Sequence, residues 1–143
     1  MAGMEAAIYN PAMIGTGLDD DAMKRCEGEQ CMKLITAVIK PFKVDEVRQA
    51  VADLGIQGLT VTEVHGYGRQ SEHGDFHHGS DARLDFLPTA KIELAVDDSI
   101  AEQVIEAVCN VARTGKPGDG KIWVAELEQA IRVRTGETGP DAV

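Results

Sequence analysis

The sequence predicts an α+β fold of the ferredoxin-like (split β-α-β) type, in which two helices cover one face of an antiparallel sheet. Three observations favour this fold: the order strand, helix, strand occurs twice, a long polar segment separates the two units, and a glycine-rich loop precedes the last strand. At 143 residues and 43% hydrophobic content, the chain suits one globular domain. We place this domain at residues 32–143, after a mobile N-terminal extension of weak periodicity, residues 1–31.

The first β-α-β unit opens with an almost continuous apolar run. Residues 33–39 read KLITAVI, which is typical of a buried strand, and Pro41 ends the run. From Lys43 the apolar residues follow a helical stripe that stops at Gly55. Residues 59–68 are rich in threonine and valine, so they are predicted to form the second strand.

The second unit follows a long polar loop, residues 69–88, which has no hydrophobic period. Loops of this length inside a compact domain are more often functional or mobile than decorative. Residues 90–96 then alternate apolar and polar side chains, as a half-buried strand does. Asp97 and Asp98 supply N-cap chemistry for a second helix. The apolar side of that helix consists of Ile100, Val104, Ile105, Val108 and Val111.

Residues 114–121 form the glycine-rich loop, and its three glycines and one proline exclude a helix or a regular strand. The loop runs into an apolar strand, residues 122–127. Backbone N–H groups, glycines that let a ligand come close, and Lys121 at the exit are the features that a polyphosphate needs. The P-loop spacing G-x4-G-K-[ST] is absent, so an ordinary glycine turn remains the alternative.

A second cationic stretch follows the last long strand. Ile131-Arg132-Val133-Arg134 alternates apolar and basic residues, and as a short strand it would place both guanidinium groups on one face, about 7 Å apart. Because the whole chain carries a formal net charge of −10, this local cationic cluster indicates an anion site. The same net charge argues against sequence-independent nucleic-acid binding. Residues 136–143 contain two glycines and a proline and are predicted to form a flexible tail.

The sequence also bears on location and assembly. No apolar run approaches the ~20 residues that span a bilayer, and the first 31 residues lack the basic-then-apolar order of a signal peptide. We therefore expect a cytoplasmic protein without direct membrane insertion. The half-apolar strands leave a second sheet face to be covered, and a partner subunit is the economical cover.

Several stretches carry a resemblance to a known family. They are residues 39–43, 60–64 with 66–70, 85–88, 114–122 and 131–137. Together they resemble the PII nitrogen-regulatory signal-transduction proteins, and the resemblance extends from Met32 to the C-terminus. It implies a homotrimer of ferredoxin-like subunits, with ATP or ADP in the clefts between subunits. It also implies that the long mobile loop, the T-loop of the family, contacts target proteins.

The resemblance implies a nucleotide site built from two subunits. One subunit would wrap the phosphates with its glycine loop, and its neighbour would add the paired arginines. Arginines and a lysine suit a triphosphate because charge-assisted hydrogen bonds are about twice as strong as neutral ones. The residues implied are Gly118, Asp119, Gly120 and Lys121 around the phosphates, Arg132 and Arg134 from the neighbour, Thr60 and Glu93 at the adenine and ribose, and Gly66, Gly68, Arg69 and Gln70 along the cleft.

The same resemblance bears on 2-oxoglutarate. A glutamine at the position of Gln70 joins Mg²⁺-ATP in holding this acid in the family. Relatives that sense 2-oxoglutarate usually carry a lysine where this chain has Thr89, whose hydroxyl brings no charge. Losing a charged partner typically costs ~1.5–3 kcal/mol, or roughly one to two decades in affinity. We therefore expect weakened binding of 2-oxoglutarate, with Gln70 retaining its contact.

The long loop departs from relatives at several positions. Ala82 replaces a tyrosine that many bacterial relatives uridylylate, and alanine has no nucleophile for that modification. Ser80 stands where cyanobacterial relatives carry a phosphorylated serine, and a phosphate there would add about −1.5 to −2 charge. An unmodified loop serine is the alternative. His73, His77 and His78 are either solvated loop residues or groups that bind a metal or sense pH.

The resemblance implies a sensor and not an enzyme. ATP and ADP would compete for the cleft and bias the long loop between conformations that differ in partner affinity. The loop would regulate nitrogen or carbon metabolism through a membrane transporter, a metabolic enzyme or a transcriptional regulator. Two alternatives on the same fold are a nucleotide-handling phosphotransferase with a catalytic histidine and a trimeric metal-binding protein that uses the loop histidines.

Overall fold

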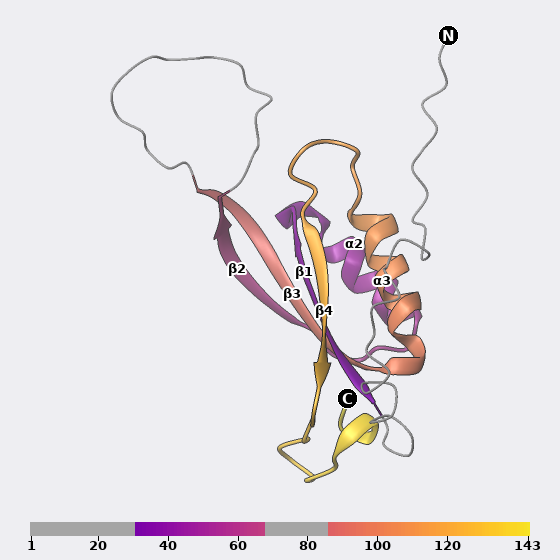
Figure 1. Cartoon of the computed structure of the whole chain (residues 1–143). Coiled ribbons are helices and arrows are strands. Elements are labelled where there is room, and N and C mark those ends of the chain that lie inside the picture. Colours follow the sequence, from indigo (N-terminus) through magenta and orange to yellow (C-terminus); the bar gives the residue numbers. More distant parts are fainter. Residues whose placement is uncertain (1–30, 68–85) are drawn as a thin grey trace, which may run out of the picture.

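The computed structural model describes residues 31–67 and 86–143. These residues form a four-stranded antiparallel sheet with two helices on one face (Figure 1). The expectations for the N-terminal extension and for most of the long loop, including its histidines and Ser80, lie outside the described residues.

The elements follow the predicted order, and the sheet confirms the split β-α-β topology. The strand order is β2-β3-β1-β4, with every neighbouring pair antiparallel. The strands are β1 (Met32–Ile39), β2 (Thr60–Gly66), β3 (Leu87–Asp97) and β4 (Lys121–Leu127). The helices are α2 (Val44–Asp53) and α3 (Asp98–Ala112), with short 3-10 helices η2 (Pro41–Lys43) and η3 (Gly139–Ala142).

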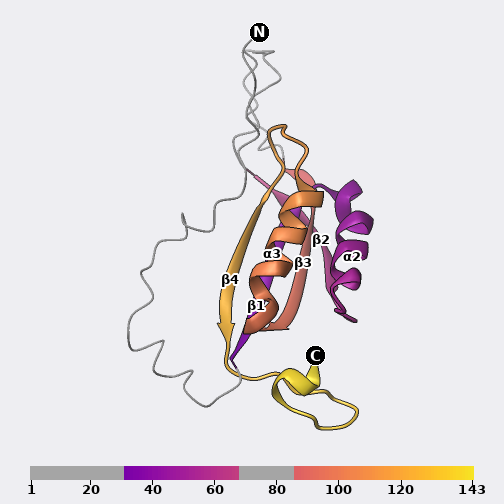
Figure 2. The ribbon, with the colours of Figure 1, turned by 90° about the vertical axis from the view of Figure 1, so that its right-hand side faces the viewer.

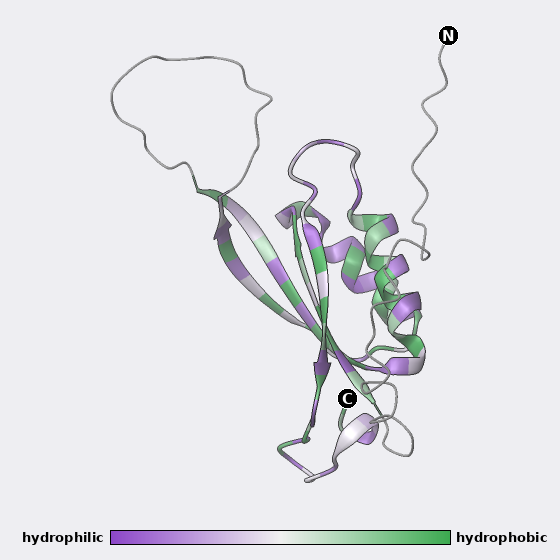
Figure 3. Ribbon diagram, viewed as in Figure 1, coloured by the Kyte–Doolittle hydropathy of each residue, from purple (hydrophilic) through white to green (hydrophobic). Residues whose placement is uncertain are grey.

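The core lies between the helices and one face of the sheet, and Figure 2 shows both helices in front of that face. Ile35 of β1 pairs with Leu94 of β3, and both side chains are almost fully buried. Buried and partly exposed residues alternate along β3, as do hydrophobic and hydrophilic ones (Figure 3). Val47 of α2 and Val104 of α3 close the core from the helix side. This alternation fixes the register, because a shift by one residue would expose the apolar set.

The opposite face of the sheet, called the open face below, is not covered by any helix or strand that the structure describes (Figure 1). Since side chains alternate along a strand, Leu34, Thr36 and Val38 of β1 belong to this face. Trp123 lies beside Thr36 in β4 and is 46% exposed. An uncovered sheet face that exposes a large aromatic side chain is consistent with the expectation, drawn from the half-apolar strands, that a partner subunit covers this face.

The long loop ends earlier than the predicted range of 69–88. Strand β3 begins at Leu87, so Leu87 and Pro88 pair with Gly66 and His65 of β2 instead of continuing the loop. A proline is tolerated here because β1 pairs with β3 only as far as Ala90. Its missing N–H therefore removes no hydrogen bond to β1.

The predicted strand at 131–133 is wrong. Ile131 makes only an isolated bridge to Thr138, and the backbone between them turns. The N–H of Gly136 donates to the Arg132 carbonyl at 2.8 Å, and Gly136 has a φ of +76°, which glycine adopts readily. An alternating pattern of only four residues is a weaker signal than the turn that Gly136 forms. The arginines therefore do not share a strand face.

The predicted flexible tail, residues 136–143, contains a short 3-10 helix. Residues Gly139–Ala142 form η3, which begins with Pro140 in its first turn. The N–H of Gly139 donates to the carbonyl of Ala130 at 3.0 Å, so this hydrogen bond fastens the C-terminal segment to the chain that leaves β4.

Candidate functional site

The glycine-rich loop connects α3 to β4 and lies at the end of the sheet where β2 ends and β3 begins (Figure 1). Gly115, Gly118 and Gly120 have φ angles of +76°, +84° and +98°. These left-handed conformations strain any residue with a Cβ atom, so the backbone path requires the glycines. The three glycines that identified the loop in the sequence therefore also allow its backbone to adopt this shape.

Asp119 turns its carboxylate toward the loop itself. Its Oδ2 atom accepts hydrogen bonds from the N–H groups of Thr114 at 2.8 Å and Gly115 at 2.9 Å. Its Oδ1 atom accepts from the Thr114 hydroxyl and forms an ion pair with Lys40 Nζ at 3.1 Å. Four donors of the same chain thus engage the Asp119 carboxylate, which gives Asp119 a role in shaping the loop.

The pKa of Asp119 reflects these contacts. Burial of the carboxyl group raises its pKa, while the hydrogen bonds from Thr114, Lys40 and Gly115 lower it. The hydrogen bonds prevail, and the pKa falls from its ordinary 3.8 to about 2. Because the donors favour the charged form, Asp119 is ionised at neutral pH.

Lys121 opens β4 on the open face of the sheet. It pairs with Val38 of β1, which pairs with Lys91 of β3 in the same row. The two lysines are thus two strand spacings apart, about 10 Å. Lys91 Nζ forms an ion pair with Glu93 Oε2 at 3.0 Å. The sequence analysis did not identify Lys91 as part of the site, because only the strand register brings it near Lys121.

The structure brings Thr60 and Glu93 together as directly opposed residues of β2 and β3. Glu93 also pairs with Thr36 of β1, which is only 4% exposed and lies next to Trp123. These four residues form one row across the open face. A carboxylate, two hydroxyls and an indole ring are groups that recognise a polar ring system with hydroxyls.

Gly66 and Thr89 lie close together near the end of the sheet where β2 ends and β3 begins. A Cβ atom at Gly66 would lie 3.5 Å from Thr89 Oγ1, which is an ordinary contact. The Thr89 hydroxyl donates to the carbonyl oxygen of Val64 at 3.3 Å. Gly68, Arg69 and Gln70, the next implied residues, lie outside the described residues.

Arg132 and Arg134 follow the far end of β4, away from the glycine loop (Figure 1). The strand between Lys121 and Leu127 spans about 20 Å at a rise of ~3.4 Å per residue. Arg132 Nη1 donates to Glu137 Oε2 at 2.8 Å, and the Thr135 hydroxyl donates to the same oxygen at 2.7 Å. One chain therefore does not bring the arginines to Lys121.

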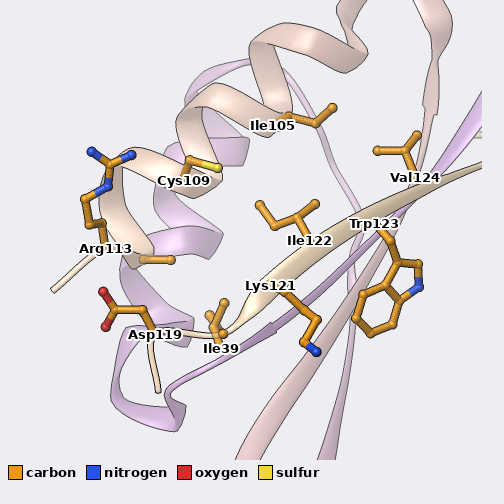
Figure 4. A pocket seen from close by; sticks show the side chains of 11 residues that line it. Ile39, Ile105, Cys109, Arg113, Asp119, Lys121, Ile122, Trp123 and Val124 are labelled. Carbon is orange, nitrogen blue, oxygen red and sulfur yellow. The ribbon is translucent and has the colours of Figure 1, made fainter. Parts of the chain in front are cut away.

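A cavity of about 590 Å³ lies between α3 and β4, and its lining includes Lys121 and Trp123 as well as Ile105, Cys109 and Ile122. Figure 4 shows Ile122 pointing toward Ile105 and Cys109, whereas Lys121 and Trp123 point away from them. Burial raises the pKa of the Cys109 thiol, and the charge of Arg113 offsets part of that effect. The cavity is lined mainly by apolar side chains, and it adjoins the glycine loop through Asp119, Gly120 and Lys121.

Two negative findings concern the described part of the chain. Within residues 31–67 and 86–143, no three histidine, cysteine or acidic side chains are grouped as a metal site would require. None of the helices in these two ranges is long and apolar enough to cross a membrane. The three loop histidines of the metal-binding alternative lie between the two ranges.

Comparison with known proteins bears on the family to which the chain belongs. The family model described as nitrogen regulatory protein P-II matches residues 32–137. Proteins with that name from Rhizobium meliloti, Rhodospirillum rubrum and Haemophilus influenzae are 54%, 53% and 52% identical to this chain over 112 residues. Each alignment covers 78% of this chain and 100% of the relative. The chain therefore belongs to the nitrogen regulatory protein P-II family.

Proposed function

We propose that this protein is a signal-transduction regulator that binds ATP or ADP at a site shared between copies of the chain. The observation that carries the proposal is the separation of two cationic groups along β4. Lys121 and the glycine loop lie at one end, and Arg132 and Arg134 follow the other end. If one phosphate chain contacts both groups, the arginines must come from a second copy.

The phosphates would lie against the glycine loop. Its left-handed glycines let the ligand approach the backbone closely, and Lys121 and Lys91 supply positive charge on the open face. Asp119 would not oppose the phosphates strongly, because Lys40 pairs with its carboxylate. The ribose and adenine would contact the row formed by Thr60 and Glu93, where a carboxylate can accept a ribose hydroxyl.

Magnesium and 2-oxoglutarate are further proposed ligands. Gln70 would hold both together with the ATP phosphates. Thr89 lies at the same end of the sheet as the loop, but its hydroxyl is neutral and already donates to the Val64 carbonyl. A weak site for 2-oxoglutarate is therefore the expected consequence.

Three copies would cover each other's open sheet faces, and Trp123 supplies exposed apolar surface for that contact. In this cytoplasmic homotrimer the nucleotide would bias the long loop toward or away from a target protein. The target would be a membrane transporter, a metabolic enzyme or a transcriptional regulator of nitrogen or carbon metabolism. A nucleotide shifts such an equilibrium only by its differential affinity for the two loop states.

Calorimetry with ATP and with ADP tests the proposal. Wild-type protein should bind both nucleotides, and Lys121→Ala and Arg132→Ala should each weaken ATP binding about tenfold or more. Lys43→Ala is the matched control, since Lys43 forms an ion pair with Glu46 at 2.7 Å outside the proposed site. Phosphate release from ATP should be negligible. Unchanged ATP affinity in both site variants, or steady turnover of ATP, would refute the proposal.

A further inference from the structure

Lys40 enters the proposed nucleotide site only through its ion pair with Asp119. It directly follows β1 and precedes Pro41, and an extended backbone at Lys40 is the conformation that a residue before proline favours. Its side chain reaches across to the glycine loop, where Nζ lies 2.9 Å from Thr114 Oγ1 and 3.1 Å from Asp119 Oδ1. Lys40 thus joins the end of β1 to a loop 74 residues away in sequence.

We propose that Lys40 is a positioning residue for nucleotide binding: through Asp119 and Thr114 it holds the glycine loop in its phosphate-accepting shape. This inference rests on the proposed function. The side chains of Lys40 and Asp119 are only 20% and 25% exposed, so solvent screens their ion pair less than a surface pair.

The network of Lys40, Thr114 and Asp119 is closed. The Thr114 hydroxyl accepts from Lys40, donates to Asp119, and accepts from the N–H of Lys116 at 3.3 Å. The two oxygens of Asp119 are thereby divided: one contacts side chains and the other contacts the N–H groups of Thr114 and Gly115. Such division fixes both the position and the orientation of the carboxylate, and hence the turn that contains it.

Lys40 also has an electrostatic effect. The glycine loop contains the carboxylate of Asp119, and without a paired cation this carboxylate would repel the phosphates of the ligand. The ammonium group of Lys40 neutralises Asp119 from the β1 side, which leaves Lys121 to act on the ligand. Removal of Lys40 would both loosen the loop and expose the phosphates to a negative charge.

The test uses Lys40→Met, which keeps the apolar stem, together with Lys40→Arg and the control Lys43→Met. Amide exchange by NMR reports on the loop without ligand, and calorimetry reports ATP affinity. Lys40→Met should speed exchange of the Thr114 and Gly115 amides and weaken ATP binding about tenfold. Lys40→Arg should restore affinity to within about threefold, because it keeps the charge and a donor. Lys43→Met should change neither quantity.

Thr114→Val provides a second test of the same network if Lys40→Met folds poorly. It removes the hydroxyl between Lys40 and Asp119 and keeps the side-chain shape, so it should also speed amide exchange and weaken ATP binding. In the double variant the two losses should be less than additive, since both act through one network. If the wild type binds ATP and either Lys40→Met or Thr114→Val binds it with unchanged affinity, the role of Lys40 is overturned, while the proposed nucleotide site stands. Absence of ATP binding by the wild type would overturn the proposed function and this inference with it.

Discussion

Gly120 packs directly against the backbone of Val38. A Cβ atom at Gly120 would lie 1.7 Å from the carbonyl oxygen of Val38 and 2.8 Å from its carbonyl carbon. Real Cβ atoms do not approach backbone atoms this closely, and a carbonyl in the middle of the sheet cannot move aside. Strand β1 therefore requires glycine at the exit of the loop, independently of any ligand.

Gly120→Ala should therefore displace the loop or destabilise the fold by about 3 kcal/mol or more. Gly115→Ala is the matched control, because Gly115 also has a positive φ but faces open space. Its cost should be only the backbone strain, about 1–2 kcal/mol. Urea unfolding of both variants measures the difference. Equal losses of stability would show that the contact with Val38 is not decisive.

Mixing two defective chains tests whether the nucleotide site is shared. Lys121→Ala and Arg132→Ala each remove one cationic group, and these groups follow opposite ends of β4. In a mixed trimer, one interface would unite an intact Lys121 with an intact Arg132. Calorimetry after unfolding and refolding the two chains together should recover a fraction of sites with wild-type ATP affinity.

The control for this mixing experiment is each variant refolded alone, which should recover none of the high-affinity sites. Failure of the mixture to gain such sites, although mass measurements show mixed assemblies, would mean that Lys121 and Arg132 do not meet at an interface.

Thr89→Lys should strengthen binding of 2-oxoglutarate in the presence of Mg²⁺-ATP by one to two decades, since an ammonium group can pair with a carboxylate of the acid (~1.5–3 kcal/mol). The substitution removes a long hydrogen bond to Val64, so its cost in stability should be small. Thr62→Lys, on the same sheet face but opposite Lys91, is the control and should have no such effect. Calorimetry with 2-oxoglutarate would decide against the idea if both variants bound it as the wild type does.

The depressed pKa of Asp119 predicts how stability depends on pH. Because the folded pKa of about 2 lies below the ordinary 3.8, the ionised carboxylate stabilises the fold above pH 3.8. This contribution, about 2 kcal/mol, should be lost as the pH falls from about 4 to about 2. The difference in unfolding free energy between wild type and Asp119→Asn should shrink over that window. A difference that stays constant with pH would contradict the assignment.

The sequence determined the elements and the chemistry of the loop. Alternating residues in β3, the apolar stripes of α2 and α3 and the clustered glycines are local patterns, so they predicted the split β-α-β topology and a loop able to approach phosphates. The turn after Ile131 was missed because four alternating residues matched a strand, while the hydrogen bond from Gly136 to Arg132 depends on how the chain closes on itself.

Only the tertiary structure decided which side chains meet. The pairing of Thr60 with Glu93 and the row that brings Lys91 near Lys121 follow from strand register, which depends on long-range pairing. Lys40 and Asp119 lie far apart in the sequence, so no local sequence pattern predicts their contact. Packing of the apolar face against two helices fixed that register, and with it the positions of the charged groups on the open face.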